Sequence, residues 1–204
     1  MNNIKNIIFD LGGVLLNIDT AKTNAAFEQL GIGDFKNNYS LDKMDRVFEN
    51  LETGKISEEE FYQSIKIISK NQLSNTQVKD AWNALLLDFR AESLAFLEKL
   101  SSKYNLYLLS NTNSIHLTAF DEIFTRNTGK TNFNAYFTKA YYSHLVGLRK
   151  PETNIYSFVL EDAGLIAEET LFIDDLAKNI EGAKLAGLQT HLLLPHERIE
   201  NLGL

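Results

Sequence analysis

Five short apolar runs along the chain predict β-strands. They lie at residues 4–9, 105–110, 137–143, 170–174 and 189–194. All except the third are nearly continuous in apolar character, which is typical of strands that are covered on both faces of a sheet. Helical patterns at residues 91–103, 151–164 and 177–187 precede the second, fourth and fifth runs. Strands that alternate with helices predict an α/β fold with a parallel sheet and helices on both of its faces.

Residues 17–90 break this alternation, and their pattern predicts no strand. Two helix starts stand out instead, because Ser57 with Glu60 and Ser74 with Gln77 have the spacing of capping boxes. We therefore expect a helical module inserted after the first strand.

Composition narrows the class of protein. The 204 residues fit one domain with a sizeable insertion, and 44% hydrophobic residues suffice for a core. The absence of cysteine excludes disulfides, thiolate metal sites and a cysteine nucleophile, and it fits a reducing compartment. We expect a cytoplasmic protein, since the first apolar run is short, is interrupted by Asp10 and does not resemble a signal peptide.

The charge balance bears on the partners. A formal net charge of −7 opposes binding to nucleic acid and to anionic membranes. No apolar stretch approaches the roughly 20 residues of a membrane span. We expect a small-molecule partner and neither nucleic acid nor membrane, while the oligomeric state is not predicted. An anionic substrate would need a local cation.

Polar residues follow three of the predicted strands, at the carboxyl ends where open parallel sheets bind their ligands. They are Asp10, Ser110 with Asn111, and Asp174 with Asp175, and a further polar segment carries Lys150 just before a predicted helix. Clustered carboxylates repel one another unless a cation lies among them. Ligands that are all oxygen suit Mg²⁺, which commonly bridges protein to phosphate.

The same residues suggest phosphate chemistry. Ser110 and Asn111, in a turn that opens a helix, would offer hydroxyl and backbone N–H donors to an anion. Lys150 would neutralise both the phosphate and an attacking carboxylate, which makes Asp10 a candidate nucleophile that forms an aspartyl-phosphate. Each element alone also fits an ordinary turn, helix cap or surface loop. We therefore base the prediction on their order at successive strand ends. The four histidines show no metal-binding spacing.

That order resembles a known family. The segments "FDLGGVL", "LLSNTN", "GLRKPETNIY" and "LFIDDLAKNIEGAKLAG" are similar to the four motifs of the haloacid dehalogenase superfamily, and especially to bacterial phosphatases that act on glucose 1-phosphate. The resemblance implies a doubly wound, Rossmann-like core with a cap inserted after the first motif. We expect the core at residues 1–16 and 91–204 and the helical cap at residues 17–90.

The resemblance also implies roles for single residues. Asp10 would be the nucleophile and a Mg²⁺ ligand, and Gly12 would offer its carbonyl to the metal. The remaining roles would be phosphate binding by Ser110 and Asn111, stabilisation of phosphate and Asp10 by Lys150, and metal binding or orientation by Asp174 and Asp175.

Gly12 departs from the pattern of most phosphatases in this superfamily, which carry at this position a second aspartate that protonates the leaving oxygen. General acid–base help is typically worth roughly 10²–10⁴-fold. Three functions therefore stay open. The first is a Mg²⁺-dependent phosphatase of a small phosphomonoester, expected to be a sugar phosphate, which forms an aspartyl-phosphate. The others are a haloacid dehalogenase-type hydrolase and a non-catalytic phosphate-ligand binding protein.

Two features favour the phosphatase. Dehalogenases usually carry an aromatic residue where Gly12 stands and lack an acidic pair like Asp174 and Asp175.

The cap would select the substrate, and six of its polar or aromatic residues are candidate contacts, although each also fits a solvated face or the cap interior. They are Asp19, Asp45, Arg46, Tyr62, Trp82 and Arg90.

Overall fold

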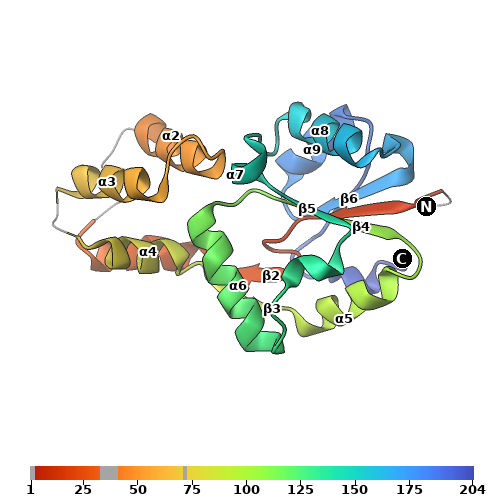
Figure 1. Ribbon diagram of the computed structural model, residues 1–204, viewed down its shortest axis with the longest axis horizontal. Helices are drawn as coiled ribbons and strands as arrows, with labels where there is room; N and C mark the ends of the chain where they lie inside the picture. Colours follow the sequence, from red (N-terminus) through yellow and green to blue (C-terminus); the bar gives the residue numbers. More distant parts are fainter. Residues whose placement is uncertain (1–2, 33–40, 71–72) are drawn as a thin grey trace.

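A five-stranded parallel sheet forms the centre of the computed structural model (Figure 1). The structure describes residues 3–32, 41–70 and 73–204, apart from the side chains of residues 41–45 and 68. The strands are β1 (Asn6–Phe9), β4 (Asn105–Ser110), β5 (Lys139–Tyr142), β6 (Thr170–Asp174) and β7 (Gln189–Leu192). All five predicted strands are confirmed, and each end lies within two residues of its predicted position.

The strand order is β5-β4-β1-β6-β7, with parallel pairing throughout. The chain runs outward from β1 on one side of the sheet and then returns to β1 to build the other side. This is a doubly wound sheet, and its order reverses at β1. The predicted fold class is confirmed, and the carboxyl end of β1 is the place where ligands bind in such folds.

Alternating residues of each strand contact helices on opposite faces of the sheet. In β1, Ile7 and Phe9 face one cluster and Ile8 faces the other. The helices of the first face are α5 (Ala91–Leu100) and α6 (Ser114–Thr128), and those of the second are α8 (Thr153–Ala163) and α9 (Ala177–Leu185). Figure 1 shows the two pairs on either side of the strands. Burial on both faces explains the apolar runs of the sequence.

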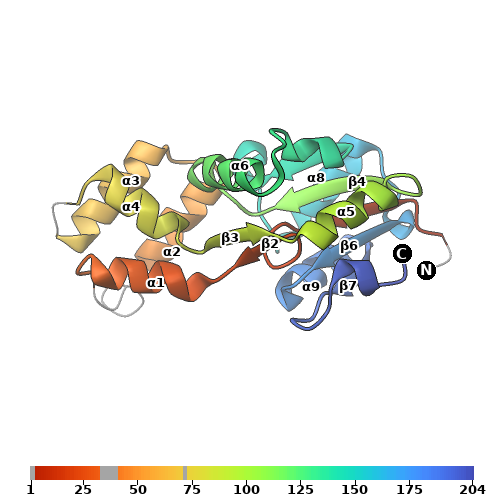
Figure 2. The same cartoon turned by 90° about the horizontal axis from the view of Figure 1, so that it is seen from below.

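Four helices form a second cluster at one end of the molecule (Figures 1 and 2). They are α1 (Thr20–Gln29), α2 (Leu41–Glu52), α3 (Glu58–Ser69) and α4 (Asn75–Asn83). Both predicted capping boxes are present, at the starts of α3 and α4. Phe27, Phe61 and Val78 are buried in the interior of this cluster, together with Ile115 from the first turn of α6. The boundaries expected at residues 16 and 91 stay predictions.

The expectation of no strand within residues 17–90 is wrong. Strands β2 (Leu16–Ile18) and β3 (Leu86–Phe89) pair antiparallel and lie between the helical cluster and the sheet (Figure 2). They contain three and four residues, which is too short to show the alternation of a strand. Their pairing also joins segments that are distant in sequence, which no local pattern can reveal.

Shorter helices complete the fold. They are α7 (Ser143–Val146) and the 3₁₀ turns Phe133–Tyr136, Ala167–Glu169 and Ile199–Asn201. Among the helices in the described ranges, none has the length and apolar character needed to cross a membrane.

Candidate active site

Asp10 lies at the carboxyl end of the central strand. Its backbone N–H donates to the carbonyl of Ile173 over 2.9 Å, so β6 fixes the position at which the carboxylate leaves the sheet. A tight turn follows, and Gly13 in this turn has a φ of 73°. A Cβ atom on Gly13 would collide with the carboxylate of Asp175. Glycine is therefore required there for two reasons, the backbone conformation and the close approach of a carboxylate.

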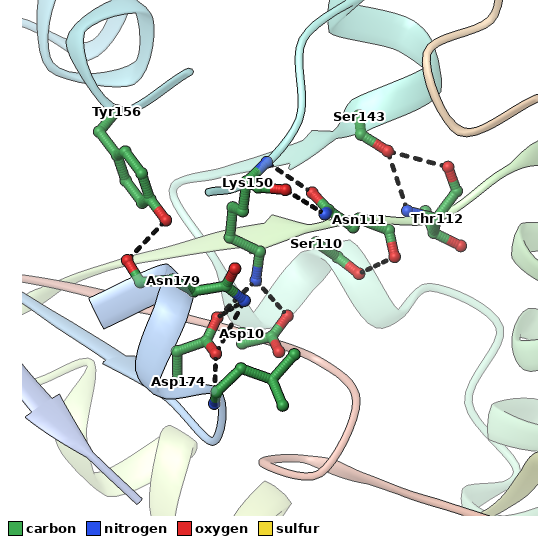
Figure 3. A network of polar contacts seen from close by, with 10 residues as sticks. Asp10, Ser110, Asn111, Thr112, Ser143, Lys150, Tyr156, Asp174 and Asn179 are labelled. Atoms are coloured by element: carbon green, nitrogen blue, oxygen red, sulfur yellow. Dashed lines mark hydrogen bonds and ion pairs between the residues drawn. The ribbon is translucent and has the colours of Figure 1, made fainter. Parts of the chain in front are cut away.

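Lys150 joins the carboxyl ends of two strands (Figure 3). Its Nζ atom lies 2.7 Å from Asp10 Oδ1 and 2.7 Å from Asp174 Oδ2, and the residue is 1% exposed. A buried ammonium group needs such partners, because desolvation alone would be costly. The two carboxylates therefore hold the lysine charged at the end of the sheet.

Asp174 is fully engaged by protein groups. Its Oδ1 accepts from the Leu176 N–H over 2.8 Å, and its Oδ2 accepts from Lys150. Both oxygens also accept from Asn179 Nδ2 over 3.0 Å, and Asn179 in turn accepts at its carbonyl from the Tyr156 hydroxyl (Figure 3). The four acceptor positions of this carboxylate are thus occupied. Its neighbour Asp175 is half-buried and lies on the wall of a cavity.

Asn111 positions the segment that carries Lys150. Its side-chain amide donates to the Lys150 carbonyl over 2.8 Å and accepts from the Lys150 N–H over 2.9 Å. The hydroxyl of Ser143 bonds both the N–H and the carbonyl of Thr112, which fixes the loop after β4. The amide of Asn111 is therefore occupied, while Ser110 lies beside it at the end of β4.

The electrostatics reflect this crowding. Burial raises the pKa of Asp10 to about 7, with Lys150 opposing the shift and Asp174 adding to it. Burial and the charge of Asp174 also raise the pKa of Asp175. The pKa of Lys150 is raised because the attraction of the two aspartates outweighs its burial. One lysine thus offsets only part of the negative charge that gathers here.

The donor set fits a hard cation. Oxygen atoms of Asp10, Asp174 and Asp175 lie within 4.8 Å of one another. Oxygen ligands of this kind suit Mg²⁺, and a divalent ion would relieve the repulsion between the carboxylates.

A cavity of about 270 Å³ opens over these groups. Six of the seven predicted site residues line it: Asp10, Gly12, Ser110, Asn111, Lys150 and Asp175. The seventh, Asp174, lies beneath it and contacts Lys150. The structure therefore brings all seven together from the ends of β1, β4 and β6 and from the loop before α8.

Sequence reasoning missed several residues of the same wall. They are Ile18, Thr20, Glu52, Arg149, Leu176, Lys178 and Asn179. Two of them had a visible signal, because Arg149 directly precedes Lys150 and Asn179 lies one helical turn after the acidic pair. Glu52 had none, since only the fold brings the end of α2 to this place.

Five of the six candidate cap contacts have described side chains, and none of these five lines the cavity. Asp19 caps α1, and Arg90 bonds the carbonyl of Val14. Tyr62 is buried in the helical cluster, and Trp82 stacks on His116. Arg46 is exposed, and the side chain of Asp45 falls outside the described residues.

A carboxylate, a buried lysine and an acidic pair thus gather where the strand order of a Rossmann-like sheet reverses, which is the place where doubly wound α/β enzymes bind their ligands. A model of the haloacid dehalogenase-like hydrolases matches residues 4–187. The chain belongs to this family.

Relatives and solved structures agree with this assignment. A D-ribitol-5-phosphate phosphatase from Bacteroides thetaiotaomicron is 34% identical over 92% of this chain and 90% of its own length. A family enzyme from the same organism, solved in complex with magnesium and inorganic phosphate, is 35% identical with a TM-score of 0.87, over 98% of this chain and 100% of that one. A family hydrolase from Porphyromonas gingivalis is 34% identical with a TM-score of 0.85, over 96% and 93% of the two chains.

Proposed function

We propose that the protein is a magnesium-dependent phosphatase that hydrolyses a small phosphate ester of a sugar or sugar alcohol. The observation that carries the proposal is the Asp10 carboxylate, held by Lys150 at the wall of a cavity that Asp175 also lines. The relatives support it, since one is a ribitol phosphate phosphatase and another was solved with magnesium and phosphate.

Asp10, Asp175 and the carbonyl of Gly12 would hold the magnesium ion. Asp175 is the better direct ligand of the acidic pair, because the acceptor positions of Asp174 are occupied by protein donors. Asp174 would then serve to hold Lys150. When bound, the ion would neutralise the phosphate oxygens and hold them in position for displacement.

The reaction would run in two displacements at phosphorus. An Asp10 oxygen attacks the phosphorus, and the bond to the ester oxygen breaks, which leaves an aspartyl-phosphate. The released ester oxygen takes a proton from water and departs as the alcohol. Lys150 neutralises charge on Asp10 and on the phosphate. The Ser110 hydroxyl and the backbone N–H of Asn111 would bind the phosphate oxygens. Water then attacks the phosphorus, releases inorganic phosphate and restores Asp10.

The two alternative functions have weaker support. A dehalogenase needs no divalent ion, so an acidic residue at the cavity wall would only add repulsion near Asp10. A protein that merely binds a phosphate ligand has no use for a carboxylate beside the phosphate, since like charges repel. Both alternatives leave Asp175 without a role.

Metal removal tests the proposal. We expect phosphate release from sugar phosphates to fall to background in excess chelator and to return when Mg²⁺ is added in excess. The assay uses a panel of sugar, sugar-alcohol and aryl phosphates, and inorganic phosphate is measured. Undiminished turnover in excess chelator would contradict a metal-dependent mechanism. No turnover of any phosphate ester with Mg²⁺ would contradict the phosphatase itself.

A further inference from the structure

The cavity continues past Asp10 to a second pair of charged residues. Glu52 is the last residue of α2, and Arg149 precedes Lys150 in the loop before α8. Arg149 Nη2 lies 2.9 Å from Glu52 Oε2, and both side chains line the same cavity as Asp10. The side chain of Glu52 is 23% exposed and that of Arg149 is 30% exposed, so the pair is largely removed from solvent.

The hydrogen bonding of this pair is incomplete. Arg149 Nη2 and Glu52 Oε2 form an ion pair that is not a hydrogen bond. Within the described part of the chain, Glu52 Oε2 and Arg149 Nε are buried without any hydrogen-bond partner. Buried polar atoms are nearly always bonded, and leaving one unpaired is costly. Two polar atoms that make no hydrogen bond, Glu52 Oε2 and Arg149 Nε, therefore belong to residues that line the proposed substrate site.

A hydroxyl group can bond to both atoms at once, because it donates one hydrogen bond and accepts others. Neither a halide nor an alkyl chain can do so. We propose that Glu52 and Arg149 bind a hydroxyl of the substrate's leaving group, which makes polyhydroxylated phosphate esters the preferred substrate class. The proposal rests on the phosphatase function proposed above and adds the residues that select among its substrates.

The electrostatics of the pair agree with this role. Burial raises the pKa of Glu52, and the charge of Arg149 is the strongest opposing influence. Arg149 and Lys178 also add positive charge to the cavity wall beside Lys150.

The pair could instead act only as a latch between α2 and the loop before α8. A latch holds the cavity in shape for every substrate, whereas a hydroxyl-binding pair discriminates between substrates. The two roles therefore differ in selectivity and need not differ in total activity.

The experiment compares two substrates of equal chain length, ribitol 5-phosphate and pentyl phosphate. We expect the wild type to prefer ribitol 5-phosphate in kcat/KM. Glu52→Gln and Arg149→Lys should each reduce this preference about 10- to 100-fold, the effect of losing a hydrogen bond to a charged group. Glu49→Gln, an exposed position of α2 with the same chemical change, should keep the wild-type preference.

Three outcomes would overturn the inference: no preference in the wild type, an equal loss on both substrates in Glu52→Gln and Arg149→Lys, or a loss of preference in Glu49→Gln. If Glu52→Gln does not fold, Arg149→Lys decides the question alone. p-Nitrophenyl phosphate separates the two proposals. If the wild type hydrolyses p-nitrophenyl phosphate but does not prefer ribitol 5-phosphate over pentyl phosphate, the proposed phosphatase function stands and the proposed hydroxyl site is wrong.

Discussion

At the scale of single residues, Lys150 depends most on its surroundings. It is almost fully buried, and its charge is balanced by Asp10 and Asp174, while the Asn111 amide fixes its backbone. The ring of Phe172 lies below it, 5.5 Å from Nζ. Together these contacts hold the ammonium group of Lys150 next to the Asp10 carboxylate. The lysine is thus positioned before a substrate arrives, which lowers the cost of organising charge during the reaction.

Gly12 raises the question of how the leaving oxygen is protonated, and its surroundings permit a test. Its φ lies outside the left-handed region, and a Cβ atom would lie 3.2 Å from Ile18 Cδ1, the mobile end of a side chain. We therefore expect Gly12→Asp to fold. If the missing acid limits the rate, the variant should hydrolyse an alkyl phosphate faster, by up to roughly 10²–10⁴-fold. An aryl phosphate, whose leaving group needs little protonation, should gain much less.

The measurement is kcat for both substrates in wild type and variant, with circular dichroism and thermal unfolding as checks of the fold. Equal rates on alkyl and aryl phosphates in the wild type, unchanged in Gly12→Asp, would show that another group or the substrate itself supplies the proton.

At the scale of elements, the loop that carries Lys150 is held by its contact with α9. A Cβ atom on Gly182 of α9 would collide with the Pro151 carbonyl oxygen and lie 3.0 Å from Tyr156 Cε2. The helix therefore approaches the loop as closely as glycine allows. This contact fixes the distance between the end of β6, with its acidic pair, and the lysine.

Gly182→Ala tests this contact. Alanine in a helix interior is favoured over glycine by about 1 kcal/mol. If nothing obstructed the added Cβ atom, Gly182→Ala would therefore stabilise the protein. Overpacking typically costs about 1–3 kcal/mol, and backbone cannot move aside as a side chain can. We expect a net loss of stability in chemical denaturation, together with a lower kcat because Lys150 is displaced. A gain of about 1 kcal/mol with unchanged kcat would show that the packing is loose.

The contact between α4 and α6 depends on a buried histidine. His116 Nδ1 lies 2.7 Å from Asn83 Oδ1, and its ring stacks on Trp82 with centroids 4.9 Å apart. Burial lowers the pKa of His116 to about 3, whereas the unfolded chain has the ordinary value of about 6.5. Between these values the unfolded state binds a proton that the folded state does not. Stability is therefore complete above pH 6.5 and falls as the pH decreases toward 3.

His116→Gln removes this proton linkage. We expect the variant to be less stable than the wild type at pH 7, because the stacking is lost. At pH 5 the gap should shrink by about 2 kcal/mol, because pH 5 lies about 1.5 units below the pKa of the unfolded chain and each unit corresponds to about 1.4 kcal/mol. Denaturant unfolding of both proteins at both pH values measures it. The same gap at pH 7 and pH 5 would mean that His116 is accessible to protons in the folded state.

At the scale of the whole molecule, the sequence predicts the sheet well and the cavity incompletely. Parallel strands that are buried on both faces produce continuous apolar runs, so the sequence predicts the sheet. The carboxyl ends of these strands carry Asp10, Ser110 and Asp174, so the sequence also predicts which edge of the sheet holds the candidate site. Strands β2 and β3 are too short to leave a pattern. The meeting of Glu52 with Arg149 depends on how the helical cluster lies against the sheet, which no local spacing encodes.

The central claim is that Asp10 attacks phosphorus, and the direct test is a single-turnover reaction quenched in acid. The enzyme is mixed with Mg²⁺ and a sub-stoichiometric phosphate ester that it hydrolyses, and its peptides are examined by mass spectrometry. We predict a transient gain of one phosphoryl group on Asp10, and neither that gain nor turnover in a folded Asp10→Asn variant. Phosphorylation of another residue, or an Asp10→Asn variant with a kcat near that of the wild type, would contradict the account.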